Sequence, residues 1–224
     1  MLNKIKLIIF DLDGTLADTL WEIRDAINAA LAAYGLPTVN YSAVKRGINN
    51  GPRNLCLALL PESHRKDDAF VDEFLARYHE EYGKIYEKTK KTYDGISDAV
   101  RCLYARGYKL AVLSNKQDDY VKKMTAAFFP DGEFSAARGS DGVLKKPDPA
   151  LTLELIHSID PELTPERCVL VGDSDVDVKT AHNAGMICVG ASWGYRGRDV
   201  LEENHADIVI DYPEELTAVF GHHS

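Results

Sequence analysis

The stretch that most constrains the fold of this chain is KLIIFDLDGTL, Lys6–Leu16. Four consecutive apolar residues, Leu7–Phe10, suit a strand that is covered on both faces, and Gly14 then allows the backbone to turn sharply. Ligands of an open parallel sheet collect beyond the carboxyl ends of its strands. Asp11 and Asp13 are therefore predicted to lie where a substrate would bind.

Paired aspartates beside a glycine have two other interpretations, a calcium loop and a plain surface turn. An EF-hand loop that began at Asp11 would need glycine at its sixth position, which is Leu16, whereas Gly14 occupies the fourth. The calcium loop is therefore excluded. The surface turn stays open at this point.

Length and composition are those of an ordinary globular protein with room for a core domain and an insert: 224 residues, 45% of them hydrophobic. No apolar run approaches the roughly 20 residues that span a bilayer, and no signal-peptide pattern precedes the first strand. We therefore expect a cytoplasmic protein, monomeric or homodimeric, with no membrane partner.

The formal net charge of −9 disfavours nucleic acid as a partner, because an acidic surface repels the phosphate backbone. A small ligand is favoured instead. If that ligand is anionic, an acidic protein needs locally positive help, which directs attention to a metal ion and to particular lysines.

Cysteines and histidines give little sign of a metal or disulfide site. The four cysteines are far apart and form no C-x-x-C pair, so buried thiols are expected. The histidines show no ligand spacing, and His222 and His223, which could be natural or the remnant of a tag, are left out of the argument.

The order of apolar patterns predicts two domains. Residues 18–90 show only helical periodicity, with helices expected from Thr19, from Pro52 and from about Asp67. From residue 91 onward helices and strands alternate, which is typical of a parallel sheet. We predict a doubly wound, mainly parallel α/β core, residues 1–17 and 91–224, with an all-helical cap, residues 18–90, inserted after the first strand. The elements expected in the second part are helices 96–106, 118–128, 150–159, 176–184 and one from 213, and strands 109–114, 134–138, 168–171, 187–189 and 208–210.

Three further polar motifs repeat the logic of the first. Ser114 and Asn115 follow one predicted strand, Lys145 and Lys146 precede Pro147, and a third group of carboxylates follows Gly172. Taken singly, each motif has an ordinary explanation as a helix cap or a loop. Gathered at one edge of the sheet, they supply carboxylates for a hard cation, a hydroxyl for phosphate oxygens and a lysine for charge neutralisation, which phosphoryl transfer requires. The carboxylates of the third group are Asp173, Asp175 and Asp177.

The order D-x-D-G-T, Ser-Asn, Lys-Pro and G-D-S-x-x-D resembles the four signature motifs of the haloacid dehalogenase-like superfamily. The resemblance covers the predicted core nearly end to end and implies a Rossmann-like fold with Mg²⁺ as cofactor. It implies that Asp11 is the nucleophile, that Asp13 is the general acid and base, and that Asp11, the Asp13 backbone carbonyl and Asp173 hold the metal. Asp177 would hold these groups in position without binding the metal itself.

The same resemblance implies that Ser114 holds a phosphate oxygen and that Lys146 neutralises the phosphoryl charge, with Asn115 as a further substrate-binding residue. Lys145 is an alternative to Lys146 that spacing alone leaves open. The superfamily's dehalogenases lack the second aspartate, since they have no alkoxide to protonate. Asp13 therefore favours a phosphomonoesterase that acts through an aspartyl phosphate on a small phosphorylated metabolite.

Within the superfamily, the helical insert is of the C1 type, and the segments 46–60 and 193–211 resemble phosphoglycolate phosphatases. This resemblance implies 2-phosphoglycolate as the substrate, with Asn49, Asn50 and Arg53 facing its carboxylate; the alternative is that they cap and solvate helices. Trp193 and Tyr195 are interpreted as packing residues. Pyrophosphatase, nucleotidase, sugar-phosphate phosphatase and phosphomutase activities stay open, and a non-enzymatic scaffold is the remaining alternative.

Overall fold

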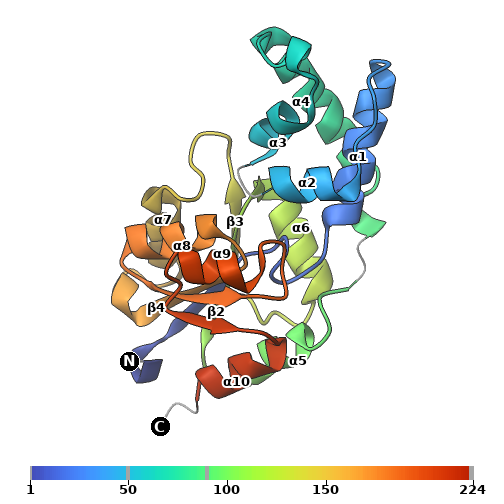
Figure 1. The fold of residues 1–224 in the computed structure, drawn as a ribbon. Coiled ribbons are helices and arrows are strands. Elements are labelled where there is room, and N and C mark those ends of the chain that lie inside the picture. Colours follow the sequence, from blue (N-terminus) through green and yellow to red (C-terminus); the bar gives the residue numbers. More distant parts are fainter. Residues whose placement is uncertain (1, 49–50, 89–90, 222–224) are drawn as a thin grey trace. The chain divides into compact units, whose positions relative to one another are not determined.

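The computed structural model describes residues 2–48, 51–88 and 91–221, and the chain divides into two compact units. One unit combines Met1–Ala17 with Lys91–Ser224, and the other is Asp18–Lys90. The second unit is thus an insertion between the first strand and the rest of the sheet-bearing unit (Figure 1).

The sheet-bearing unit contains a six-stranded sheet with the order β3-β2-β1-β4-β5-β6. All its neighbouring strands pair in parallel, so the predicted α/β class is confirmed. The first strand lies at the centre of this order, between β2 and β4. The strands are β1 (Leu7–Phe10), β2 (Lys109–Gln117), β3 (Ala136–Ser140), β4 (Cys168–Gly172), β5 (Ile187–Ala191) and β6 (Ile208–Ile210).

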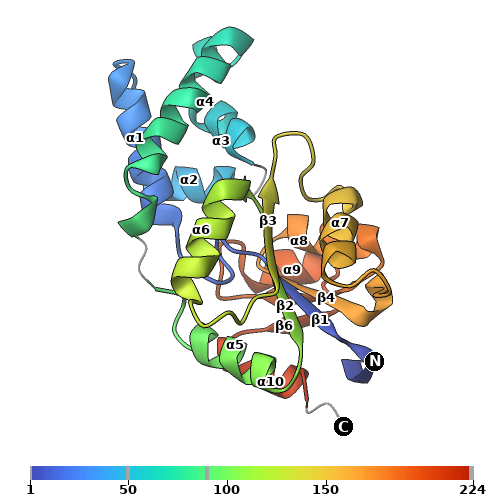
Figure 2. The ribbon, with the colours of Figure 1, turned by 180° about the vertical axis from the view of Figure 1, so that it is seen from behind.

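Helices cover both faces of the sheet, which explains why β1 is apolar at every position. Leu7 and Ile9 pack in one cluster with side chains of α7, α8 and α9. Because successive strand residues point to opposite faces, Ile8 and Phe10 face the other layer, where α5 and α6 lie (Figures 1 and 2). The helices of this unit are α5 (Ile96–Ala105), α6 (Asp118–Phe128), α7 (Pro149–Ile159), α8 (Asp175–Ala184), α9 (Gly197–Glu203) and α10 (Leu216–Val219).

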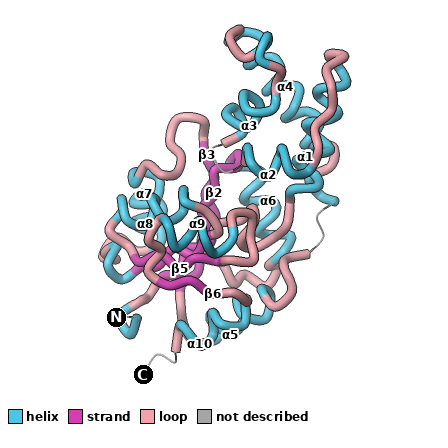
Figure 3. The backbone as a smooth tube through the Cα atoms, in the orientation of Figure 1, coloured by secondary structure: helices cyan, strands magenta, loops and turns pink. Residues whose placement is uncertain are grey.

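The inserted unit is built from helices, and each regular element described between residues 18 and 88 is helical (Figure 3). Its long helices α1 and α4 pack on one another and bury Leu31, Phe74 and Tyr78. None of the helices within the described residues is long and apolar enough to cross a bilayer. The α-helices of this unit are α1 (Leu20–Ala33), α2 (Tyr41–Gly47), α3 (Pro52–Leu59) and α4 (Asp68–Gly83).

Two helices escaped the sequence analysis because they bury too little for a periodic pattern. Val44 is the buried residue of α2, which begins where the Asn40 side chain accepts a hydrogen bond from Ala43 N. Leu201 is the buried residue of α9. The strand predicted at 134–138 lies two residues later, at Ala136–Ser140. The four cysteines are free thiols, of which Cys102 alone is half-buried and the others are buried.

The central position of β1 predicts a large cost for truncating its core side chains. Ile9→Ala should lower the free energy of unfolding by about 2–5 kcal/mol, because Ile9 is fully buried among the cluster that joins β1 to α7 and α8. Urea denaturation measures this loss. Val143→Ala is the matched control, since Val143 is 85% exposed, and it should change stability by no more than about 0.5 kcal/mol. Equal effects of the two substitutions would contradict the assigned core.

Candidate active site

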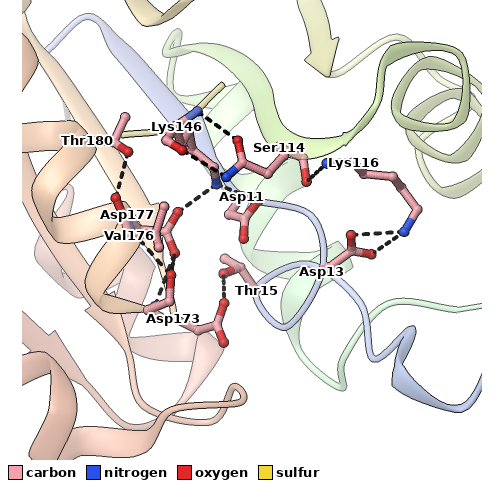
Figure 4. A network of polar contacts seen from close by, with 12 residues as sticks. Asp11, Asp13, Thr15, Ser114, Lys116, Lys146, Asp173, Val176, Asp177 and Thr180 are labelled. Carbon is pink, nitrogen blue, oxygen red and sulfur yellow. Dashed lines mark hydrogen bonds and ion pairs between the residues drawn. The ribbon is translucent and has the colours of Figure 1, made fainter. Parts of the chain in front are cut away.

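The polar motifs meet because β1 lies between β2 and β4 and all three strands point the same way. Asp11 follows β1, Ser114 lies near the end of β2, and Asp173 follows β4. Lys146 reaches the same edge from the segment between β3 and α7 (Figure 4). The four side chains are buried, so this edge of the sheet is a polar cluster closed off from bulk solvent.

Lys146 lies between two carboxylates. Its Nζ is 2.8 Å from Asp11 Oδ1 and 2.7 Å from Asp177 Oδ1. The Lys146 side chain is only 3% exposed, whereas Lys145 is exposed, so Lys146 is the lysine of the pair that enters the cluster. The structure thus identifies Lys146, and not Lys145, as the lysine within the cluster.

Burial and mutual repulsion shift the pKa values of this cluster. Burial raises the pKa of Asp11 to about 7, despite the Lys146 ammonium beside it, and the charge of Asp177 adds to the shift. Burial, then Asp177 and Asp11, hold the pKa of Asp173 well above its usual range. For Lys146, burial opposes the charged form, but Asp11 and Asp177 outweigh it and raise the ammonium pKa. The cluster is therefore short of positive charge.

Asp173 is held at both carboxylate oxygens. Thr15 Oγ1 donates to Asp173 Oδ1 at 3.2 Å, and the Tyr195 backbone N–H donates to Oδ2 at 2.7 Å. Gly14 makes room for this carboxylate: its φ is +92°, and a Cβ there would lie 2.6 Å from Asp173 Oδ2. The D-x-D-G-T turn thus needs its glycine both for backbone conformation and for close approach.

The segment after β5 is a support that sequence reasoning assigned only to packing. The Trp193 indole N–H donates to the Thr15 carbonyl at 3.1 Å, so this segment contacts both Thr15 and Asp173. A Cβ on Gly194 would lie 2.3 Å from Asp173 Cβ and 2.4 Å from the Gly14 carbonyl oxygen. No local pattern marks this approach in the sequence, because it depends on which distant segments meet at Gly194.

At Asp177, as at Asp173, protein donors reach both carboxylate oxygens, and one of the donors to Asp177 is the Lys146 ammonium. Lys146 Nζ occupies Oδ1, and the Ser174 hydroxyl and backbone N–H donate to Oδ2 at 2.6 and 3.1 Å. Ser174 and Asp177 together form a capping box at the start of α8. The capping box therefore fixes the carboxylate that in turn fixes the Lys146 ammonium.

The donor set fits a hard divalent cation. Oxygens of Asp11, Asp173 and Asp177 lie within 4.8 Å of one another. Lys146 is the cation paired with Asp11, and its Nζ lies 2.8 Å from Asp11 Oδ1. Clustered carboxylates with spare lone pairs are the ligands that Mg²⁺ and similar ions prefer. Asp177 receives the Lys146 ammonium and two donors of Ser174, whereas Asp173 receives the Thr15 hydroxyl and the Tyr195 N–H. The predicted metal ligands Asp11 and Asp173 stay predictions.

Asn115 lies in the cluster but faces the protein. Its Nδ2 donates to the Lys146 carbonyl at 3.0 Å, and its Oδ1 accepts from the Lys146 N–H at 2.7 Å. The amide therefore fixes the backbone of the lysine segment against β2. Ser114, buried beside it, accepts a hydrogen bond from Lys116 N. The predicted substrate contacts of Ser114 and Asn115 stay predictions.

Asp13 lies against a lysine that the sequence analysis did not single out. Lys116 Nζ is 2.9 Å from each of the Asp13 carboxylate oxygens, and both side chains are nearly buried (Figure 4). Lys116 follows Ser114 by two residues in β2, but the register shift of β2 against β3 between Leu113 and Gln117 interrupts strand alternation there, so spacing alone could not place Lys116.

Arg53, in the inserted unit, is bound to carboxylates of its own unit. Its Nη2 is 2.8 Å from Asp68 Oδ1, and its Nε is 3.0 Å from Asp72 Oδ1. These hydrogen bonds raise the pKa of the guanidinium. The predicted substrate role of Arg53 stays a prediction, and the structure supplies a competing role for it. Asn49 and Asn50 lie outside the described residues.

Comparison with known proteins relates most of the chain to one family. The sequence profile of the haloacid dehalogenase-like hydrolases matches residues 8–191. A phosphoglycolate phosphatase of Haemophilus influenzae is 32% identical over 98% of this chain and 100% of its own length. A phosphoglycolate phosphatase of Pseudomonas putida is 31% identical over 92% of this chain and 76% of its own length.

Solved structures of related proteins have the same fold as this chain. A predicted phosphoglycolate phosphatase of Haemophilus somnus superimposes with a TM-score of 0.84 at 28% identity, over 97% of this chain and 99% of that one. CbbY of Rhodobacter sphaeroides, in complex with phosphate, gives a TM-score of 0.77 at 25% identity over 95% and 96% of the two chains. The resemblance seen in the motifs is thus confirmed: the chain belongs to the haloacid dehalogenase-like hydrolase family, as a hydrolase of the phosphatase type.

Proposed function

We propose that this protein hydrolyses a phosphomonoester of a small metabolite, with Mg²⁺, through an aspartyl phosphate on Asp11. The observation that carries the proposal is the buried Asp11 carboxylate, paired with Lys146 and close to Asp173 at the ends of adjacent strands.

In the first step, a carboxylate oxygen of Asp11 bonds to phosphorus while the bond to the ester oxygen breaks. The electron pair of that bond goes to the ester oxygen, which takes the proton of the Asp13 carboxyl group. Lys146 offsets negative charge at the reacting centre, and the Ser114 hydroxyl donates to a phosphoryl oxygen. The products of this step are the free alcohol and the aspartyl phosphate.

In the second step, the Asp13 carboxylate removes a proton from a water molecule as the water oxygen bonds to phosphorus. The bond between phosphorus and the Asp11 oxygen breaks, which releases phosphate and restores both aspartates. Asp11, Asp173 and the Asp13 backbone carbonyl would hold a Mg²⁺ ion, which supplies positive charge against the phosphoryl oxygens throughout. Asp177 serves by holding Lys146 in place.

For the substrate we propose 2-phosphoglycolate. The relatives named phosphoglycolate phosphatase match nearly the full length of this chain, the inserted unit included. A helical insert that closes over the strand ends would exclude water and contact the part of the substrate that is not phosphate. The cytoplasmic location and the monomeric or homodimeric state stay predictions.

Asp11→Asn should abolish turnover by several powers of ten, because the amide is no nucleophile, while removing one of several crowded buried carboxylates leaves the fold intact. Asp13→Asn should lower kcat about 10²- to 10⁴-fold, as expected when a general acid and base is lost. Steady-state assays on 2-phosphoglycolate measure both losses, and circular dichroism checks the fold. Near-normal rates in either variant would show that the roles are misassigned.

Mg²⁺ should raise the melting temperature, and the increase should grow from about pH 5.5 to about pH 8.5. The pKa of Asp11 is raised to about 7 and that of Asp173 is also raised, so the metal-free fold loses stability as pH rises through these values and the carboxylates ionise. Mg²⁺ then meets no competing protons and relieves the repulsion. Thermal melts with Mg²⁺ or with a chelator measure the difference.

Asp173→Asn is the control for the metal site. It should abolish the Mg²⁺-dependent increase while leaving the metal-free melting temperature at neutral pH equal or higher, since one buried carboxylate is gone. An undiminished Mg²⁺ effect in this variant would place the metal elsewhere.

The ranking of kcat/KM should place 2-phosphoglycolate above pyrophosphate, nucleoside monophosphates and hexose phosphates. If Arg53 reads the carboxylate, Arg53→Ala should lower kcat/KM for phosphoglycolate selectively, since a guanidinium binds a carboxylate through two hydrogen bonds. If its pairs with Asp68 and Asp72 are its whole role, all substrates should change alike. Arg77→Ala is the matched control, because Arg77 pairs with Glu80 and Glu81 in the same unit.

Product analysis separates hydrolysis from its rivals. A phosphomutase of the same fold would need a bisphosphate primer and release little phosphate, and a scaffold would release none. Sustained metal-dependent phosphate release would exclude both. Phosphoglycolate at the bottom of the ranking would overturn the substrate and leave the phosphatase assignment standing.

A further inference from the structure

Each of the two aspartates of the D-x-D-G-T turn has its own lysine. Asp11 pairs with Lys146, and Asp13 pairs with Lys116. The second pair is as enclosed as an active-site group: the Lys116 side chain is 7% exposed and that of Asp13 is 11% exposed. The signature motifs account for the first lysine and leave the second unexplained.

The backbone of Lys116 is fixed from two sides. Between Leu113 and Gln117 the register of β2 against β3 shifts, so β2 carries extra residues there. Gly139 of β3 packs so closely that a Cβ on it would lie 2.5 Å from the Lys116 carbonyl oxygen, and its N–H donates to Asp118 Oδ1 at 2.8 Å. The Lys116 side chain therefore starts from a closely packed strand end.

Asp13, by contrast, lies on a turn, and the contact with Lys116 restrains its side chain. Nζ is 2.9 Å from both carboxylate oxygens, which restricts rotation of the carboxylate as well as its position. A general acid must hold its proton within hydrogen-bond reach of one particular oxygen of the substrate, so loss of this restraint would misplace the proton.

Stability alone does not explain the pair. Burying two charges costs desolvation free energy that their attraction often only offsets, and apolar replacements of buried ion pairs are frequently neutral or stabilising. A lysine that merely filled space could be an apolar side chain of similar length. A contact from Lys116 to both oxygens of Asp13 is useful if the Asp13 carboxyl group must be kept in one orientation.

We propose that Lys116 is a positioning residue that restrains the Asp13 carboxyl group, from which the leaving-group oxygen takes its proton. The inference rests on the proposed function, in which Asp13 protonates that oxygen as its bond to phosphorus breaks. It predicts that the importance of Lys116 depends on the leaving group. An alkoxide needs the proton in order to leave, whereas a nitrophenolate leaves without it.

The test compares kcat/KM, which reports the first phosphoryl transfer, on three substrates: 4-nitrophenyl phosphate, the phosphate monoester of an uncharged alkyl alcohol, and 2-phosphoglycolate. Lys116→Met, which keeps the length and removes the charge, should lower kcat/KM about 10- to 100-fold on both alkyl esters and less than about 3-fold on the aryl ester. Lys116→Arg should restore much of the loss, because it returns a cation. Lys122→Met, which removes an exposed lysine paired with Asp118, should change none of the three.

A double-mutant cycle with Asp13→Asn checks that Lys116 acts through Asp13. With Asp13 already replaced, Lys116→Met should cause no further loss on the alkyl esters. Thermal melts identify variants that fold poorly; if Lys116→Met is one of them, Lys116→Arg and Lys116→Gln are compared on the same three substrates.

Three outcomes would overturn the inference. Equal losses on aryl and alkyl esters would mean a structural role, a loss confined to 2-phosphoglycolate would mean that Lys116 binds the substrate carboxylate, and additive losses in the cycle would mean that it acts independently of Asp13. Wild-type protein that turns over none of the three esters would instead overturn the proposed function, and this inference with it.

Discussion

Electrostatic crowding at the ends of β1 and β4 is the constraint on which the rest of the site depends. Asp11, Asp173 and Asp177 are buried within reach of one another, and Lys146 is the cation between two of them. Burial raises the pKa values of Asp11 and Asp173, and repulsion between the neighbouring carboxylates adds to both shifts. Such a cluster persists only where the surrounding fold holds it in place.

The carboxylate cluster is held in place where backbone segments approach it closely at glycines. Gly14 and Gly194 bring two chain segments onto the Asp173 carboxylate, where a Cβ on either would collide with it. On the opposite side, the capping box at Ser174 holds Asp177, and the Asn115 amide holds the backbone of Lys146. Preorganisation of this kind lets charged groups stand ready for a reaction without rearrangement.

The position of the polar residues at the strand ends was predictable. It follows from the local apolar pattern and from the rule that parallel strands end at the same edge of a sheet. An apolar run that ends in Asp11 marks a buried strand, and parallel strands deliver their carboxyl ends to one edge, so Asp173 and Ser114 could be placed there from sequence. The close backbone approach of Gly194 and the pairing of Lys116 with Asp13 could not, since both depend on how nonadjacent segments meet. Helix α2 was missed for a simpler reason, because it buries only Val44 and has no periodic signal.

The charges of the four buried aspartates and the two lysines beside them do not balance. Asp11, Asp13, Asp173 and Asp177 carry a charge of −4 when ionised, and Lys116 and Lys146 carry +2, which leaves −2 in a buried region. A divalent cation would neutralise these six groups, whereas a phosphate dianion alone would double the excess. Metal and substrate are therefore expected to bind as a unit in which the cation comes first or together with the phosphate.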